Sequence, residues 1–82
     1  MTITAKFFAT FRDIAGTGEL ELQLTENATV TEAIELLEQQ YPQFESKLTK
    51  VALVAVNETY THRKKELQTN DVVAFFPPVS GG

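Results

Sequence analysis

The C-terminal end of the chain carries the residues whose types and spacing are best suited to chemistry. The last eight residues are Phe75, Phe76, Pro77, Pro78, Val79, Ser80, Gly81 and Gly82. The two prolines cannot continue a strand ladder and hold the chain extended. The two glycines have no side chains, so they can pass through a narrow channel and bring the terminal carboxylate to a buried site. The pattern predicts a carrier that works through the carboxylate of Gly82.

A Gly-Gly end by itself is also typical of an inert, frayed terminus. The carrier is favoured because Pro77 and Pro78 follow a predicted strand directly, with no spacer. A free carboxylate is a poor acyl electrophile and must first be activated, for which adenylation by ATP is the obvious route. The acyl-adenylate could then accept sulfur to give a thiocarboxylate, or a lysine amine to give an isopeptide bond.

Side-chain catalysis has few candidates in this sequence. His62 is the only histidine, there is no cysteine to pair with it, and we expect it to be exposed in a polar turn. The neighbouring residues 63–65 (RKK) are interpreted as a solvated turn. The sequence contains no glycine-rich phosphate loop and no clustered metal ligands, so we expect ATP to be bound by an activating partner and no cofactor or metal by this chain.

The composition narrows the class of protein further. A net charge of −4 argues against nucleic-acid binding, because phosphate contacts require Lys and Arg. The lack of cysteine excludes disulfides and thiolate sites. The first residues do not resemble a signal peptide, and no apolar run approaches the roughly 20 residues that span a bilayer. We therefore expect a soluble, cytoplasmic protein without membrane contacts.

Hydrophobic periodicity predicts the elements that position the tail. Residues 3–9 and 19–24 alternate as strands, with Ile3, Ala5, Phe7 and Ala9 inward, and residues 11–18 are predicted to connect them. Thr29 is predicted to cap a helix with Glu32 in a capping box, and Pro42 ends this helix. Its predicted apolar stripe consists of Val30, Ala33, Ile34, Leu37 and Tyr41. A short helical turn is expected within residues 43–48.

The second half of the chain predicts further strands. Residues 51–56 are expected to form a strand buried on both sides or nearly so, followed by a turn at Asn57 and Glu58. A very short strand can follow within residues 60–66, and residues 72–76 form the last strand. This order predicts an α+β protein with the β-grasp, or ubiquitin-like, fold, in which one main helix packs on a mixed sheet of four to five strands. We expect a folded domain over residues 1–76 and an extended tail over residues 77–82.

Two phenylalanines are expected to be exposed beside the tail. Phe8 lies on the polar side of its strand, and Phe76 ends the last strand. If these strands are neighbours, both rings share the outer side of the sheet, which would mark an interface. The alternative is that the chain itself covers both rings.

Four stretches of this chain resemble the small subunit of molybdopterin synthase. They are residues 6–16 (KFFATFRDIAG), 52–57 (ALVAVN), 67–76 (LQTNDVVAFF) and the tail 75–82 (FFPPVSGG). The resemblance covers essentially the whole chain. It departs at Asn70, where that family usually has glycine before the aspartate, but asparagine also tolerates a left-handed turn.

The resemblance implies a sulfur carrier in molybdenum cofactor biosynthesis. A ubiquitin-activating-like adenylyltransferase would adenylate Gly82, and a sulfurtransferase system would convert it to a thiocarboxylate (1-thioglycine). The carrier would then donate sulfur to cyclic pyranopterin monophosphate inside the large synthase subunit, in a heterotetramer of two small and two large subunits. The large subunit would supply the catalytic side chains. Docking residues implied by the resemblance and the pattern are Phe8, Arg12, Tyr60, Phe76, Pro77, Pro78, Val79 and Ser80, with Gly81 and Gly82 at the reaction centre.

Three other functions remain open from the residues alone. One is a sulfur carrier for another pathway, such as thiamine thiazole synthesis, although such carriers are usually shorter and lack the Phe-Pro-Pro tail. The second is a ubiquitin-like modifier that joins Gly82 to lysines of other proteins. The third is an interaction domain with an inert tail, for which removal of Gly81 and Gly82 would leave function intact.

Overall fold

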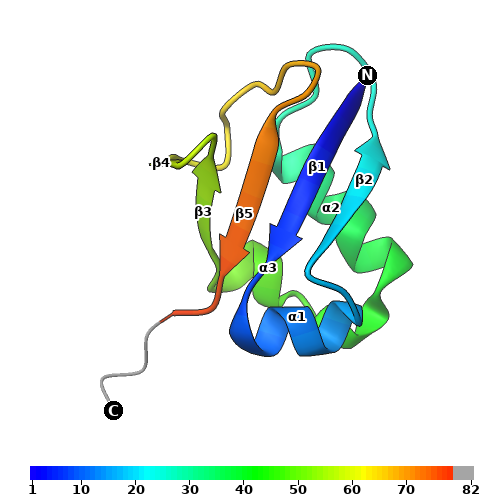
Figure 1. The fold of residues 1–82 in the computed structure, drawn as a ribbon, viewed down its shortest axis with the longest axis vertical. Coiled ribbons are helices and arrows are strands. Elements are labelled where there is room, and N and C mark those ends of the chain that lie inside the picture. The colour runs from blue at the N-terminus through cyan, green and yellow to red at the C-terminus, as the bar shows by residue number, and fades with distance from the viewer. Residues whose placement is uncertain (79–82) are drawn as a thin grey trace.

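A five-stranded mixed sheet with its longest helix packed on one face forms the domain (Figure 1). The computed structural model describes residues 1–78 of the 82-residue chain. The strands are β1 (Thr2–Phe7), β2 (Glu19–Gln23), β3 (Leu53–Val56), β4 (Thr59–Tyr60) and β5 (Val72–Phe76). The helices are α1 (Ala9–Ala15), α2 (Val30–Gln40), the 3₁₀ turn η1 (Pro42–Phe44) and α3 (Lys47–Lys50).

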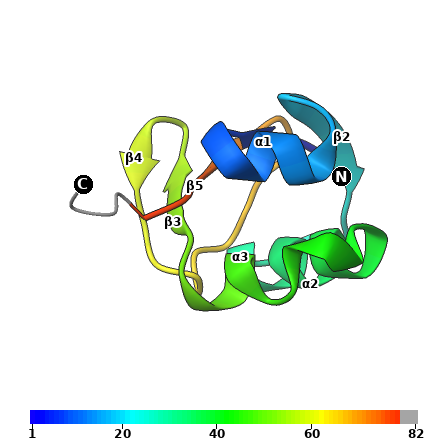
Figure 2. The same ribbon diagram turned by 90° about the horizontal axis from the view of Figure 1, so that it is seen from below.

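The strand order β2-β1-β5-β3-β4 places the first and last strands side by side at the centre of the sheet. β1 and β5 run parallel, and the other neighbouring pairs run antiparallel. The chain crosses from β2 to β3 through α2 and α3, which lie on the same side of the sheet (Figure 2). The β-grasp prediction, with one main helix on a mixed sheet, is confirmed.

The sequence predicts both strands of the first hairpin correctly, but not the segment that connects β1 to β2. Ile3, Ala5 and Phe7 are buried, as their alternation indicates, but Ala9 is exposed and has a φ of 51°. Residues 11–18 are not a simple connection, because α1 begins at Ala9 and buries Phe11. A helix of two turns is too short to show a clear 3.6-residue stripe, which explains the wrong prediction. Gly16 ends α1 in the left-handed region, with a φ of 77°.

The main helix α2 begins and ends where the sequence indicates. The backbone N–H of Glu32 donates to Thr29 Oγ1 at 3.4 Å, which satisfies one free donor of the first turn. The predicted stripe lies against the sheet, and Val30, Ala33, Ile34 and Leu37 are buried. The helix stops before Pro42, and the short turns η1 and α3 follow in the region where one helical turn is predicted.

The hydrophobic core fills the space between α2 and the sheet. Its largest members are four aromatic rings, in which Phe7 contacts Phe44 and Phe75, and Phe44 also contacts Phe11, with ring centroids 5.7–5.8 Å apart. Two of these rings come from the central strands, and the others come from α1 and η1. The core therefore holds the end of β5, where the tail begins, against three other elements.

A turn with left-handed backbone conformation connects β3 to β4. Asn57 and Glu58 have φ values of 49° and 70°, which makes the tight hairpin between β3 and β4. The side chain of Asn57 donates to Asp71 Oδ1 and accepts from the Val72 N–H, both at 2.9 Å. These bonds fix the β3–β4 hairpin to the start of β5.

The prediction of a solvated turn over residues 63–65 is wrong for Arg63. Its guanidinium reaches inward and donates to the carbonyl oxygens of Leu48 and Ala52 at 2.8 and 2.7 Å. These carbonyls lie at the end of α3, where helix carbonyls lack intrahelical partners. Arg63 therefore has a structural role, whereas Lys64 and Lys65 are exposed.

Candidate functional site

The exposed aromatic site begins with a pair of stacked rings at one end of the two central strands. Because β1 and β5 are parallel with Phe7 opposite Phe75, the next residues, Phe8 and Phe76, are also neighbours. Their ring centroids lie 4.5 Å apart with planes inclined by 10°. Phe8 is 40% exposed and Phe76 is half-buried. The chain therefore covers neither ring fully, and the alternative of two covered phenylalanines is excluded.

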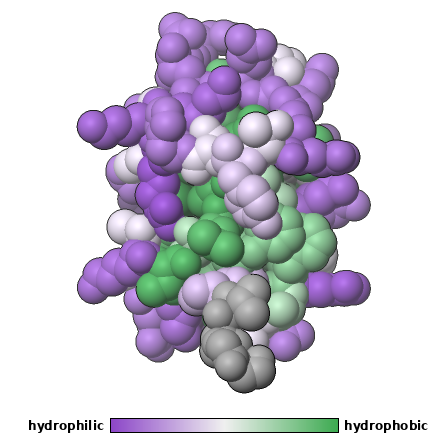
Figure 3. All heavy atoms as spheres, turned by 90° about the vertical axis from the view of Figure 1, so that its left-hand side faces the viewer, coloured by the Kyte–Doolittle hydropathy of each residue, from purple (hydrophilic) through white to green (hydrophobic). Residues whose placement is uncertain are grey.

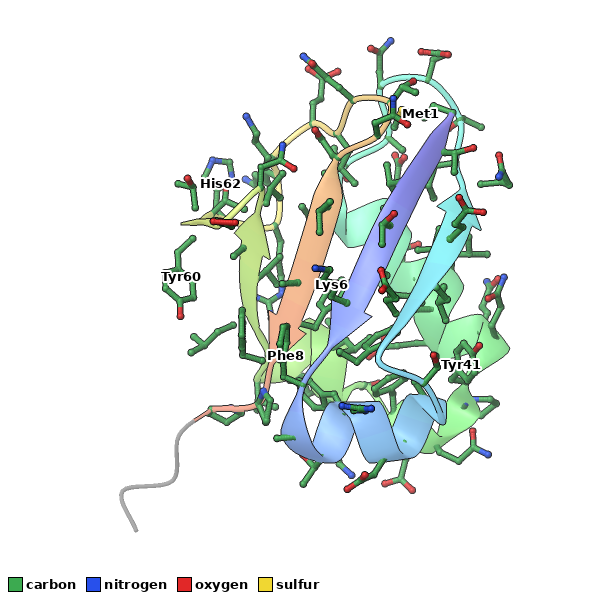
Figure 4. The ribbon with its side chains drawn as sticks, viewed as in Figure 1. Met1, Lys6, Phe8, Tyr41, Tyr60 and His62 are labelled. Carbon is green, nitrogen blue, oxygen red and sulfur yellow. The ribbon has the colours of Figure 1, made fainter. Side chains whose placement is uncertain are left out.

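Tyr60 extends this pair across the sheet. The tight hairpin at Asn57 and Glu58 brings Tyr60 opposite Ala55 on β3. The ring is 69% exposed, and its centroid lies 6.1 Å from that of Phe76. We call Phe8, Phe76 and Tyr60 the aromatic platform. Figure 4 shows Phe8 at the end of β1 and Tyr60 at the β4 edge, both on the open side of the sheet.

Leu53 is a member of this surface that the sequence prediction missed. Residues 51–56 are predicted to be buried on both sides or nearly so. Four of them are buried (Ala52, Val54, Ala55 and Val56), but Val51 and Leu53 are 47% and 45% exposed. Leu53 lies directly opposite Phe76 in the antiparallel pair, so both side chains are on the same face. The sequence of this strand gives no clear signal, because all of its residues are apolar. Only the sheet register shows that Leu53 and Ala55 lie on the outer face while Val54 and Val56 face the core.

These residues form one continuous apolar surface. Figure 3 shows apolar side chains gathered on the side of the molecule where β3 and β4 lie, framed by polar residues. Isolated surface hydrophobes are ordinary, but a cluster with a polar border marks an interaction site. The arrangement is thus suited to binding another protein, at the point where β5 ends and the tail begins.

Arg12 lies at the border of this surface. It is exposed on α1, and its side chain passes over Gly18, where an added Cβ would lie 3.5 Å from Arg12 Nε. Arg12 and Phe8 line the same shallow hollow. The structure therefore brings Arg12 close to the aromatic platform, although the two come from different elements.

The start of the tail is placed by the end of β5. Pro77 is half-buried and Pro78 is exposed, and neither has an N–H to continue the ladder. The other predicted tail residues, Val79, Ser80, Gly81 and Gly82, lie outside the described residues.

His62 is exposed, and its Nδ1 accepts from the Lys64 N–H at 3.2 Å. Within residues 1–78, no three His, Asp or Glu side chains are grouped so as to hold a metal ion. None of the helices in this part of the chain is long and apolar enough to cross a membrane.

The fold and the exposed platform define a ubiquitin-like protein whose last strand, β5, ends beside an exposed aromatic surface. The chain belongs to the ThiS family, whose model matches residues 5–82. This match confirms that the chain is related to sulfur carriers, as the resemblance predicts.

Individual relatives agree with the family match. The chain is 36% identical over 78 residues to the molybdopterin synthase sulfur carrier subunit of Dictyostelium discoideum, covering 92% of this chain and 90% of that protein. A Pyrococcus furiosus structure assigned to molybdopterin converting factor, subunit 1, is similar with a TM-score of 0.87 and 34% identity, covering 96% of this chain and 99% of that one. The chain is also 28% identical over 92 residues to small archaeal modifier protein 3 of Haloferax volcanii, with both chains fully covered.

Proposed function

We propose that this protein is the sulfur carrier of molybdopterin synthase and carries sulfur as a thiocarboxylate on Gly82. The observation that carries the proposal is the ThiS family match over residues 5–82, because it includes the tail as well as the folded domain. The curated relative from Dictyostelium discoideum, a molybdopterin synthase sulfur carrier subunit by name, favours this pathway over others.

The chemistry assigns no acid, base or nucleophile to a side chain of this domain. A carboxylate oxygen of Gly82 attacks the α-phosphorus of ATP on an activating adenylyltransferase, and pyrophosphate leaves. Sulfur, delivered at the sulfide oxidation level by a sulfurtransferase system, then attacks the acyl carbon and displaces AMP. In the synthase this sulfur passes to cyclic pyranopterin monophosphate, and an oxygen from water restores the carboxylate. This chain supplies the acyl group of Gly82.

The aromatic platform supplies the docking energy that the tail lacks. Phe8 and Tyr60 are large exposed rings and Phe76 is a half-buried one. Exposed aromatic side chains of this kind are enriched among the residues that dominate binding energy. We assign them to docking on the large synthase subunit, with Arg12 at the border and Pro77, Pro78, Val79 and Ser80 directing Gly81 and Gly82 into its active site. By family resemblance the complex would contain two small and two large subunits.

A second candidate is a protein modifier that joins Gly82 to lysine side chains. It is favoured by the full-length similarity to small archaeal modifier protein 3. Both functions need the same adenylated Gly82 and differ only in the nucleophile that follows. A carrier for thiazole synthesis would likewise share the thiocarboxylate and differ in the partner.

A pull-down from the native host with an N-terminally tagged chain tests these possibilities. Mass spectrometry should detect the large synthase subunit and a carrier mass shifted by replacement of one oxygen by sulfur. The chain lacking Gly82 is the matched control and should show neither the shift nor sulfur transfer. Recovery of a thiazole synthase or of lysine conjugates in place of the large subunit would overturn the molybdopterin assignment, and an unshifted mass would count against any sulfur carrier.

A further inference from the structure

The centre of the open face of the sheet is hollowed out by two small residues. Ala55 on β3 and Ala74 on β5 lie opposite each other in the antiparallel register. Larger side chains surround them, so they form the floor of a hollow of about 560 Å³. Its walls are formed by Lys6, Phe8, Asn57, Glu58, Tyr60, Val72 and Phe76.

The charged side chain of Lys6 lines one wall of this hollow. Lys6 is exposed on β1, in register with Ala74 on β5, and also lines the neighbouring hollow that contains Arg12. Within residues 1–78, neither the ammonium of Lys6 nor the guanidinium of Arg12 takes part in a side-chain hydrogen bond or an ion pair. Glu58 lies at the tip of the hairpin on the other wall. The hollow thus has an apolar floor, with the ammonium of Lys6 on one wall and the carboxylate of Glu58 on the other. Glu19 lies opposite Lys6 on β2 but lines only the neighbouring hollow.

We propose that this hollow is a socket for an apolar side chain of the partner protein, with a carboxylate beside that side chain pairing with Lys6. In this proposal Ala55 and Ala74 set the depth of the socket, and Lys6 sets the charge that the partner must present. The inference rests on the proposed function, because the partner is the protein that receives the tail ending at Gly82.

A protein segment fits this socket better than a small molecule. Drug-sized ligands bury most of their surface in enclosed pockets, whereas this hollow is lined on one side by the exposed rings of Phe8 and Tyr60. Protein interfaces place one well-buried anchor inside a ring of weaker contacts that exclude water. Complementary charge at the edge of such an anchor fixes its register and speeds the encounter.

Filling the socket tests the role of its floor. The change Ala74→Leu places a larger side chain in the hollow and adds no charge. Binding to the purified large subunit of molybdopterin synthase from the same host, measured by calorimetry, should weaken about 30-fold or more, as for loss of a dominant contact. The matched control is Thr4→Leu, which enlarges a residue on the same face of β1 that does not line the hollow. It should change the dissociation constant by less than about twofold.

Replacing Lys6 by a residue of opposite charge tests whether its positive charge contributes to binding. Lys6→Glu should weaken binding about tenfold at low salt, and the difference from the wild type should shrink as the salt concentration rises. Lys64→Glu makes the same change at an exposed position outside the hollow and should have at most a small effect.

The outcomes separate this inference from the proposed function. A folded Ala74→Leu variant that binds like the wild type, or equal losses for Lys6→Glu and Lys64→Glu, would overturn the socket while the carrier function stands. If thermal unfolding shows that Ala74→Leu does not fold, the two lysine variants decide. A wild-type chain that does not bind the large subunit would overturn the proposed function, and the socket with it.

Discussion

Two adjacent pairs of phenylalanines, where β1 and β5 end, lie in opposite environments. Phe7 and Phe75 face the helices and are completely buried, with ring centroids 5.8 Å apart. Phe8 and Phe76 come one residue later, face away from α2, and stack at 4.5 Å with much of their surface exposed. We call them the inner pair and the outer pair.

The difference between the pairs comes only from the alternation of the strands. Successive side chains on a strand point to opposite faces, so a step of one residue moves a ring from the core to the surface. The parallel register of β1 and β5 then places Phe7 beside Phe75 in the core and Phe8 beside Phe76 on the outer face. The inner pair is therefore expected to determine stability, and the outer pair to determine recognition.

The largest expected effect is that of removing one inner ring. Phe75→Ala leaves a cavity in the middle of the aromatic cluster and should lower the free energy of unfolding by about 3–5 kcal/mol. A domain of this size is typically stable by only about 4–12 kcal/mol, so the loss is a large share of the total. Urea titration followed by circular dichroism measures it.

Phe76→Ala is the matched control for the same side chain one position later. It should cost about 1 kcal/mol, because the ring is half-exposed and leaves no enclosed cavity. Equal losses for Phe75→Ala and Phe76→Ala would contradict the division between inner and outer pairs.

A change in the outer pair should weaken partner binding more than it lowers the stability of the fold. Phe76→Asp places a charge at the centre of the aromatic platform and should weaken binding to the large synthase subunit by about 2 kcal/mol or more, roughly 30-fold. Its thermal midpoint should fall by only about 4–8 °C, the shift that a loss of about 1 kcal/mol produces in a domain of this size. Unchanged binding in surface plasmon resonance would remove the outer pair from the docking surface.

A third test repeats the comparison on β3, away from the rings. Val54 is buried and Leu53 is exposed, so Val54→Ala should cost about 2 kcal/mol of stability and Leu53→Ala less than about 1. Only Leu53→Ala should weaken binding to the large subunit. The two variants are compared by denaturant unfolding and by calorimetry, and a loss of binding confined to Val54→Ala would contradict the assignment of Leu53.

Much of the fold could be predicted because its long elements carry clear periodicity. The helix from Val30 was marked by its cap, its stripe and Pro42, and the alternation of β1, β2 and β5 needs no other information. The short elements were missed or mistaken because tertiary contacts decide them. Phe11 becomes buried because the core has room for it, and Arg63 turns inward because two carbonyls at the end of α3 need donors.

The candidate site could be predicted only in part, because tertiary contacts also decide which of its residues come together. Phe8 and Phe76 stand out as aromatic residues on an outer face, and their contact follows once β1 and β5 are neighbours. Leu53 was missed because a continuous apolar run hides its own alternation. The socket could not be predicted, since two alanines in strands become a floor only when larger residues from three other segments surround them.

The smallest expected effect is the coupling between the rings within each pair. A double-mutant cycle on Phe8 and Phe76, with each changed to Ala alone and together, should give a coupling of about 0.5–1.5 kcal/mol in stability. The same cycle on Phe7 and Phe75 should give a larger value, because those two rings share one enclosed space and Phe44 contacts Phe7. A measurable outer coupling means that the free protein already holds its platform in the stacked arrangement, which lowers the entropy lost on docking. A coupling near zero would mean that Phe8 and Phe76 act as two separate contacts, and the outer pair would then owe its geometry to the strand register alone.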